Sequence, residues 1–147
     1  MELTVAQALK RAVKVHKEGN LQEAEKLYRA VLHVQPSNPD ANHNLGVLAV
    51  SVNQGMLAIK LFENAVATNP KIEQYWLSYI DILSKEKQFD KLRLVLEKAK
   101  KQGVSEEKLD IFNSNLKLGL SKNRTDLSAK KKSVLKKDKK PSLRGNI

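Results

Sequence analysis

The sequence of 147 residues contains no cysteine, and this absence excludes both a disulfide framework and a metal site built on thiolates. Aromatic residues make up only 5% of the chain, which favours paired helices over a β-sandwich. No apolar run approaches the roughly 18 residues that a membrane-spanning helix needs. The N-terminal segment MELTVAQALKR has an acidic residue at position 2 and lacks the apolar stretch of a signal peptide. We therefore expect a cytoplasmic protein.

Motifs for catalysis and for cofactor binding are also missing. The sequence has no Gly-rich phosphate loop, and His16, His33 and His43 lie in separate segments without the spacing of a metal site. Asp40 and Asp81 could face each other across a groove. A carboxylate pair without a pocket, however, more often contacts a partner protein than acts as a catalytic acid and base. We expect a protein that is not an enzyme and that needs no cofactor and no metal.

Positive charge is concentrated at the C-terminal end of the chain. Residues 119–147 hold 10 Lys or Arg against Asp126 and Asp138, a net charge of +8, whereas the first 118 residues hold 17 bases and 14 acids, a net charge of +3. Residues 121–147 are rich in Lys and Ser, and we expect a disordered basic tail there. Such a tail could bind nucleic acid or anionic membrane, serve as a nuclear address, or only keep the chain in solution. It has no interleaved aromatic residues for stacking on bases, which weakens the nucleic-acid hypothesis.

A repeat with a period of 34 residues organises the rest of the chain. The segment 38–70 places small and large side chains at fixed distances, and a shift of 34 positions in either direction finds their counterparts. The middle unit has Gly46, Ala58, Phe62, Ala65 and Pro70; the first has Ala12, Ala24, Tyr28, Val31 and Pro36; the third has Ile80, Leu92, Leu96 and Ala99. Apolar spacing, capping residues and Gly or Pro breaks predict helices over about 5–17, 22–35, 39–51, 56–68, 71–83, 89–102 and 105–120. Gly103 is predicted to end the sixth helix in a left-handed conformation.

This pattern resembles the tetratricopeptide repeat, a helix-turn-helix unit of 34 residues. The resemblance implies an all-α fold: a right-handed superhelix of three antiparallel helix-turn-helix repeats, at about 5–38, 39–72 and 73–104, closed by a C-terminal capping helix at about 105–120. The domain would then span residues 1–120. In the third unit Ile80 and Leu92 stand where the family has small residues, and Val104 replaces the proline. We therefore expect a wider helix crossing in that unit.

In the family that the sequence resembles, the first helix of each pair lines the inner side of a curved surface. Residues spaced by three and four share one face of a helix, and on these three helices they predict a shallow groove with an apolar floor and polar edges. Such a groove suits a peptide or a helix of a partner protein; the alternative is a set of solvated helix faces without a partner. The groove residues are Leu9, Val13, His16, Asp40, His43, Asn44, Val47, Gln74, Leu77, Ser78 and Asp81.

Two recognition modes of similar modules can be compared with these positions. Modules that hold the C-terminal carboxylate of chaperones use a clamp of Lys, Asn and Arg, and of its positions only Asn44 matches, since Leu9, Val13, Gln74 and Ser78 occupy the others. Carboxylate capture is therefore disfavoured. Asn44 also resembles the inner-face asparagine that bonds a peptide backbone in repeats attached to glycosyltransferases. In those repeats the asparagine recurs in successive units. Here Lys10 and Ser78 occupy the equivalent positions of the neighbouring units, so a local hydrogen bond of Asn44 is an equal alternative.

The sequence thus predicts a non-catalytic scaffold that binds a protein or peptide partner in a concave groove. One alternative is binding of nucleic acid or anionic membrane through the basic tail. Another is an accessory or truncated module of a bacterial transferase. Tyr75, Trp76 and Tyr79 are interpreted as packing in the third unit rather than as binding anchors. The identity of the partner and the oligomeric state stay open.

Overall fold

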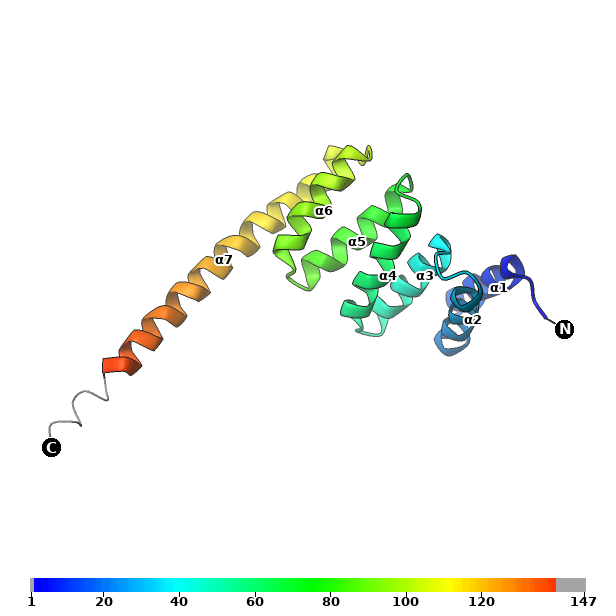
Figure 1. The fold of residues 1–147 in the computed structure, drawn as a ribbon, viewed down its shortest axis with the longest axis horizontal. Helices are drawn as coiled ribbons and strands as arrows, with labels where there is room; N and C mark the ends of the chain where they lie inside the picture. Colours follow the sequence, from blue (N-terminus) through cyan, green and yellow to red (C-terminus); the bar gives the residue numbers. More distant parts are fainter. Residues whose placement is uncertain (1, 140–147) are drawn as a thin grey trace, which may run out of the picture.

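The computed structural model describes residues 2–139 and the side chains of residues 2–122. This part of the chain folds into α-helices without any β-strand, as the sequence predicts (Figure 1). The helices are α1 (Val5–Lys17), α2 (Leu21–Val34), α3 (Pro39–Ser51), α4 (Gly55–Thr68), α5 (Glu73–Lys85), α6 (Phe89–Lys101) and α7 (Glu106–Lys139).

Side-chain caps fix where the first helix of each of the first two pairs begins. The Thr4 hydroxyl accepts a hydrogen bond from the Gln7 N–H at 3.1 Å, and the Gln7 side chain accepts one from the Thr4 N–H at 2.9 Å. Asn38 caps α3 by accepting from the Ala41 N–H at 2.9 Å. Both caps satisfy backbone donors that a helix leaves unpaired at its N-terminus.

The breaks between helices follow the predicted positions closely. Gly19 and Gly103 have φ angles of +84° and +94°, so Gly103 ends α6 in the left-handed conformation that the sequence predicts. Helix α5 begins at Glu73, two residues later than predicted. The reason is local: the Asn69 side chain accepts from the Lys71 N–H at 3.4 Å and supports a turn across Pro70.

Small side chains allow close packing within the first two helix pairs. Ala12 and Ala24 are fully buried in the first pair, and Ala58 is fully buried in the second. At Gly46 in α3 an added Cβ atom would lie 2.5 Å from Cε1 of Phe62 in α4, so only glycine permits this approach. The pairs α1/α2, α3/α4 and α5/α6 stack in chain order around a main core that spans all three pairs (Figure 1), and Ala8, Val31 and Ala41 form a second, smaller cluster.

The third pair is wider, as expected from its larger residues. Ile80 and Leu92 are both fully buried at the positions that hold small residues in the other two pairs. The backbones of α5 and α6 consequently lie farther apart than those of α3 and α4. Side chains fill the space between α5 and α6, where the backbones do not approach closely.

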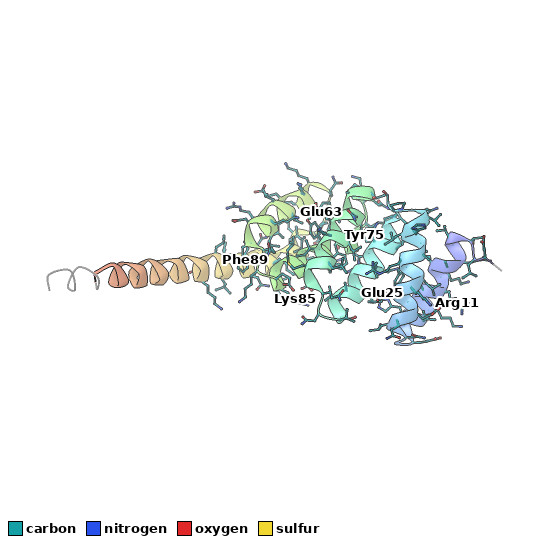
Figure 2. The ribbon with its side chains drawn as sticks, turned by 60° about the horizontal axis from the view of Figure 1, so that its bottom comes forward. Arg11, Glu25, Glu63, Tyr75, Lys85 and Phe89 are labelled. Atoms are coloured by element: carbon teal, nitrogen blue, oxygen red, sulfur yellow. The ribbon has the colours of Figure 1, made fainter. Side chains whose placement is uncertain are left out.

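Helix α7 covers the end of the stack. Leu109 and Leu116 are buried against the core, and Gly119 lies so close to the Phe89 ring that an added Cβ atom would be 2.2 Å from it. Figure 2 labels Phe89 near the point where α7 leaves the helical body. The buried residues of α7 therefore cap the stack, as the sequence predicts.

Helix α7 is longer than the sequence predicts. The sequence predicts a capping helix that ends near residue 120 and a disordered tail from residue 121; the structure instead continues the helix to Lys139. The sequence between Gly119 and Pro141 contains no Gly or Pro, and its Lys, Ala and Leu residues are good helix formers, which accounts for the continuation. The last part of the predicted tail, residues 140–147, lies outside the described residues. Over residues 2–139, none of the helices has the length and apolar content to cross a membrane.

The crossing at Gly46 generates a stability prediction. Gly46→Ala should lower the free energy of unfolding, because overpacking against the buried Phe62 ring costs about 1 to 3 kcal/mol, more than the roughly 1 kcal/mol of helix propensity that alanine gains over glycine. Gly55→Ala is the matched control, since its new Cβ would meet only the flexible carboxylate end of Glu86, which can swing away. Urea unfolding followed by circular dichroism measures both. A Gly46→Ala variant as stable as the parent chain would contradict this account of the crossing.

Candidate functional site

Helices α1, α3 and α5 form the inner surface of the stack. Helix α1 approaches α3 and α3 approaches α5, whereas α2, α4 and α6 do not approach one another closely. A stack that is closed on one side and open on the other curves toward the closed side. The concave surface is therefore built from the first helix of each pair, where the eleven predicted groove residues lie.

A row of hydrogen bonds connects α3 to α5 across this surface. His43 Nε2 lies 2.9 Å from Ser78 Oγ, and Gln74 Nε2 donates to the same Ser78 oxygen at 3.1 Å. On the other side of the ring, His43 Nδ1 lies 3.4 Å from Asn44 Oδ1. One arrangement of protons satisfies all three contacts: Gln74 donates to Ser78, the Ser78 hydroxyl donates to His43 Nε2, and His43 Nδ1–H donates to Asn44. This arrangement needs a neutral imidazole.

The His43 ring is held between aromatic side chains from two other helices. Its centroid lies 4.8 Å from that of Tyr75 in a stacked arrangement and 5.5 Å from that of Phe62 in a tilted one. The Tyr75 hydroxyl also donates a hydrogen bond to the Asp40 carboxylate. Burial raises the pKa of Tyr75, with the same effect from Asp40, so this phenol stays protonated as a donor. Figure 2 shows Tyr75 in the middle of the helical body.

Burial controls the protonation of both inner-surface histidines. It lowers the pKa of His43 below its ordinary value of 6.5, although the Asn44 hydrogen bond and the Asp40 charge act in the opposite direction. Burial also lowers the pKa of His16. His16 Nδ1 lies 3.0 Å from the Tyr28 hydroxyl inside the first helix pair, away from the row on α3 and α5.

The remaining predicted residues differ in how far they are available to a partner. Leu9, Val13 and Leu77 are half-buried and pack against the core, whereas Val47 is 38% exposed. Asp81 forms an ion pair with Lys85 on its own helix at 2.9 Å. Because Asp40 is bound to Tyr75 instead, the two carboxylates have separate partners and form no acid–base pair.

The structure therefore brings together one part of the predicted groove. One cluster, which we call the α3–α5 row, consists of Asp40, His43, Asn44, Gln74 and Ser78. Helix α1 beside it carries Leu9, Val13 and His16. On α5, Leu77 packs against the core and Asp81 pairs with Lys85.

Tyr75 contacts two residues of this row, which its sequence position alone did not indicate. Tyr75 is buried as expected for a packing residue, but it also holds both Asp40 and His43. A numerical pattern points to these contacts. His43–Ser78 and Asp40–Tyr75 are both separated by 35 residues, one more than the repeat period, which places such pairs side by side on successive inner helices.

Among residues 2–122 there is no group of three His, Cys, Asp or Glu side chains that could hold a metal ion. The α3–α5 row instead presents fixed hydrogen-bonding groups beside an exposed valine. This combination can recognise a polypeptide backbone and an apolar side chain together.

Comparisons with known proteins show which fold this is. No protein-family model matches the chain, and no curated protein matches it. Solved structures do match: the first TPR of Spaghetti (RPAP3) bound to the HSP90 peptide SRMEEVD has a TM-score of 0.68 and 15% identity over 80% of this chain and 93% of that one. This chain has the tetratricopeptide-repeat fold. The type III secretion translocator chaperone SycD of Yersinia enterocolitica gives a TM-score of 0.66 and 15% identity over 84% and 90% of the two chains.

A third match comes from a much larger protein. The O-GlcNAc transferase of Thermobaculum terrenum, as its K341M mutant, has 25% identity and a TM-score of 0.58 over 70% of this chain. The match spans only 21% of the transferase chain. The likeness therefore concerns a helical segment of about one fifth of that enzyme.

The burial of the two inner-surface histidines predicts a dependence of stability on pH. Since the pKa of His43 and that of His16 are lowered in the folded chain, the unfolded chain takes up more protons as pH falls below about 6.5, the ordinary histidine pKa. Stability should thus be complete above that pH, decline as pH falls toward the folded-state pKa values, and change no further through these groups below them. His43→Gln should make this decline shallower, and His16→Gln/His43→Gln shallower still. Thermal unfolding between pH 7.5 and 5 measures the slopes; the same slope in the parent chain and the double variant would contradict the assignment.

Proposed function

We propose that this chain is a non-catalytic protein-interaction scaffold, which binds a peptide or a helix of a partner protein along the concave surface of α1, α3 and α5. The observation that carries this proposal is the α3–α5 row, in which His43, Ser78 and Gln74 join two helices through side-chain hydrogen bonds. Side chains that are already held in place lose little conformational freedom on binding, so their contacts add more to affinity.

Asn44 is the residue best suited to contact a partner's backbone. Its carbonyl oxygen faces His43, and its amide N–H groups make no hydrogen bond within the described residues. Every buried side-chain nitrogen or oxygen in that part of the chain has a partner, so these N–H groups must reach solvent. They can donate to a backbone carbonyl, while Val47 one helical turn farther on meets an apolar side chain.

Two of the similar solved structures contain peptides, which supports this class of partner. The RPAP3 repeat domain binds an HSP90 peptide, and SycD has also been solved with a peptide of the translocator YopD, at a TM-score of 0.62 and 14% identity. Of the carboxylate-clamp positions this chain matches only Asn44, with Gln74 and Ser78 at two of the others. We therefore infer that an internal segment of the partner binds, rather than its C-terminal carboxylate.

The test introduces a charge on the floor of the concave surface. Peptides are selected on the parent chain from a library of random dodecapeptides, and their affinities are measured for Val47→Glu by isothermal titration calorimetry. Affinity should fall by about tenfold or more, because an apolar peptide side chain would bury the new carboxylate without a partner.

Val34→Glu is the matched control for this test. Val34 is 67% exposed at the end of α2, away from the concave surface, so the same chemical change should leave the affinities unaltered. Circular dichroism verifies that both variants stay folded. If every selected peptide binds Val47→Glu as tightly as the parent chain, the concave surface is not the binding site.

Binding of nucleic acid or anionic membrane through the basic segment stays a prediction. The observation that favours it is the net charge of +8 in residues 119–147 together with the continuation of α7 beyond the helical body (Figure 1). Deletion of residues 121–147 should abolish such binding and leave the concave surface active.

A role as an accessory module of a transferase also stays a prediction. It is supported by the Thermobaculum terrenum match and can be tested in the coding sequence next to this one. The cytoplasmic location is likewise a prediction.

A further inference from the structure

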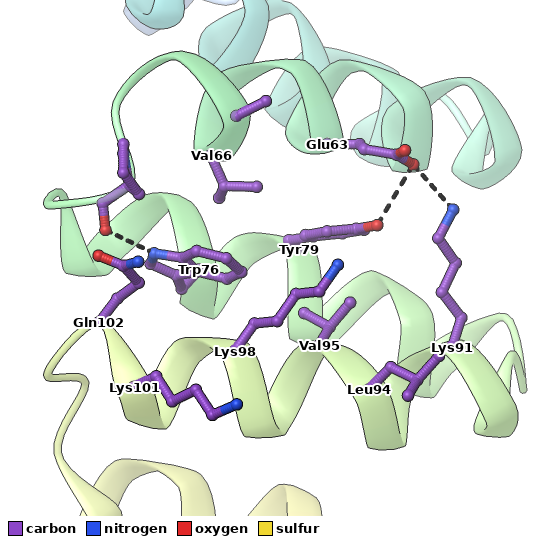
Figure 3. A pocket seen from close by; sticks show the side chains of 12 residues that line it. Glu63, Val66, Trp76, Tyr79, Lys91, Leu94, Val95, Lys98, Lys101 and Gln102 are labelled. Carbon is purple, nitrogen blue, oxygen red and sulfur yellow. Dashed lines mark hydrogen bonds and ion pairs between the residues drawn. The ribbon is translucent and has the colours of Figure 1, made fainter.

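A second concavity lies on the opposite side of the stack, between α4 and α6 above α5 (Figure 3). We call it the outer pocket. Its volume is about 460 Å³, within the range of about 300 to 1,000 Å³ that is common for ligand sites. Trp76 and Tyr79 from α5 form its floor, with Val66 from α4 and Val95 from α6 beside them. The sequence interpretation treated the two aromatic residues as packing only.

The polar atoms of the floor are already bound within the protein. Trp76 Nε1 donates to the Pro70 carbonyl at 2.8 Å, and the Tyr79 hydroxyl donates to Glu63 Oε2 at 3.3 Å. What the floor offers to a ligand is therefore apolar. Leu94, at the lip of the pocket, is 55% exposed and extends this apolar surface outward.

The charges around the pocket do not balance. Glu63 accepts a hydrogen bond from Lys91 at 2.8 Å, and this bond lowers the pKa of Glu63, so the two form a neutral pair at one end. Lys98 and Lys101 line the pocket from α6 and form no ion pair within the described residues, and Figure 3 shows Lys98 reaching toward Tyr79. Three lysines and one glutamate give the lining a net charge of +2. Lys100, which lies between them in sequence, has a different environment, an ion pair with Glu106 at 2.8 Å.

A smaller space lies one repeat earlier and shares three lining positions with the outer pocket. Glu63, Tyr79 and Lys91 correspond to Arg29, Leu45 and Leu57, which lie 34 residues earlier. Those three residues line a space of about 120 Å³ between α2 and α4. Arg29 forms an ion pair with Glu25 at 3.0 Å. The larger volume occurs next to the third helix pair.

We propose that the outer pocket binds a partner peptide in which a bulky apolar side chain is flanked by Asp or Glu. The apolar side chain packs against the exposed Leu94 above the largely covered floor of Trp76 and Tyr79, and the carboxylates pair with Lys98 and Lys101. Charge complementarity decides for an acidic peptide. A nucleic acid is disfavoured, because Trp76 and Tyr79 are only 5% and 3% exposed and present no open ring face on which a base could stack.

Trp76 is the single tryptophan of the chain, so its fluorescence reports directly on the outer pocket. The probes are three capped peptides added to the full chain: Glu-Glu-Leu-Phe-Glu-Glu, its basic counterpart Lys-Lys-Leu-Phe-Lys-Lys, and Glu-Glu-Gly-Ser-Glu-Glu without an apolar anchor. The first should change Trp76 emission with an affinity about tenfold or more above that of the other two. A rise in salt concentration should weaken its binding, since exposed charges are screened.

Charge reversal separates the pocket from general electrostatic attraction. Lys98→Glu/Lys101→Glu should reduce the affinity for the acidic peptide by about tenfold or more. Lys26→Glu/Lys117→Glu makes the same change in net charge at exposed positions on α2 and α7, and should leave the affinity within about twofold. Val47→Glu should have no effect here, which distinguishes failure of this proposal from failure of the concave-surface proposal.

Three results would overturn the proposal: no emission change with the acidic peptide at millimolar concentration, equal loss of affinity in the two lysine variants, or preference for a single-stranded oligonucleotide that depends on Lys98 and Lys101. The last result would assign the pocket to nucleic acid instead.

Discussion

The close crossing of α3 and α4, where Gly46 lies against the Phe62 ring, is the contact on which the rest of the structure depends. It holds together α3 and α4, which within residues 2–139 are the only helix pair that has another pair on each side. Because an added Cβ atom would reach the ring at 2.5 Å, the distance between the two helices leaves no room for adjustment. The position of α3 against α5, and hence the curvature of the inner surface, follows from that distance.

Phe62 connects this core contact to the candidate recognition surface. One side of the ring fills the space at Gly46, and the ring also packs against His43. His43 in turn contacts Ser78 and Tyr75 on α5. Packing in the middle pair thus sets the orientation of the imidazole, and with it the donors and acceptors of the α3–α5 row. Burial by the same neighbours keeps His43 neutral, as the hydrogen-bond arrangement requires.

Local rules and the repeat period explain which features could be predicted from sequence. Gly46, Ala58 and the left-handed Gly103 are placed by patterns that act over a few residues or one repeat. The length of α7 was mispredicted because a composition rich in Lys is compatible both with disorder and with a helix. The outer pocket was missed because its volume depends on the spacing of α4 and α6, which no local pattern encodes.

The concave surface and the outer pocket would let one small stack contact two segments of partner chains on opposite faces. The most direct test of the central claim is chemical-shift mapping by NMR on the ¹⁵N-labelled chain with a peptide selected from the random library. If the partner binds the concave surface, the largest shifts fall on amides of α3 and α5, including those of Asn44 and Ser78. Shifts confined to α2 and α7, with α3 and α5 unchanged, would contradict this claim.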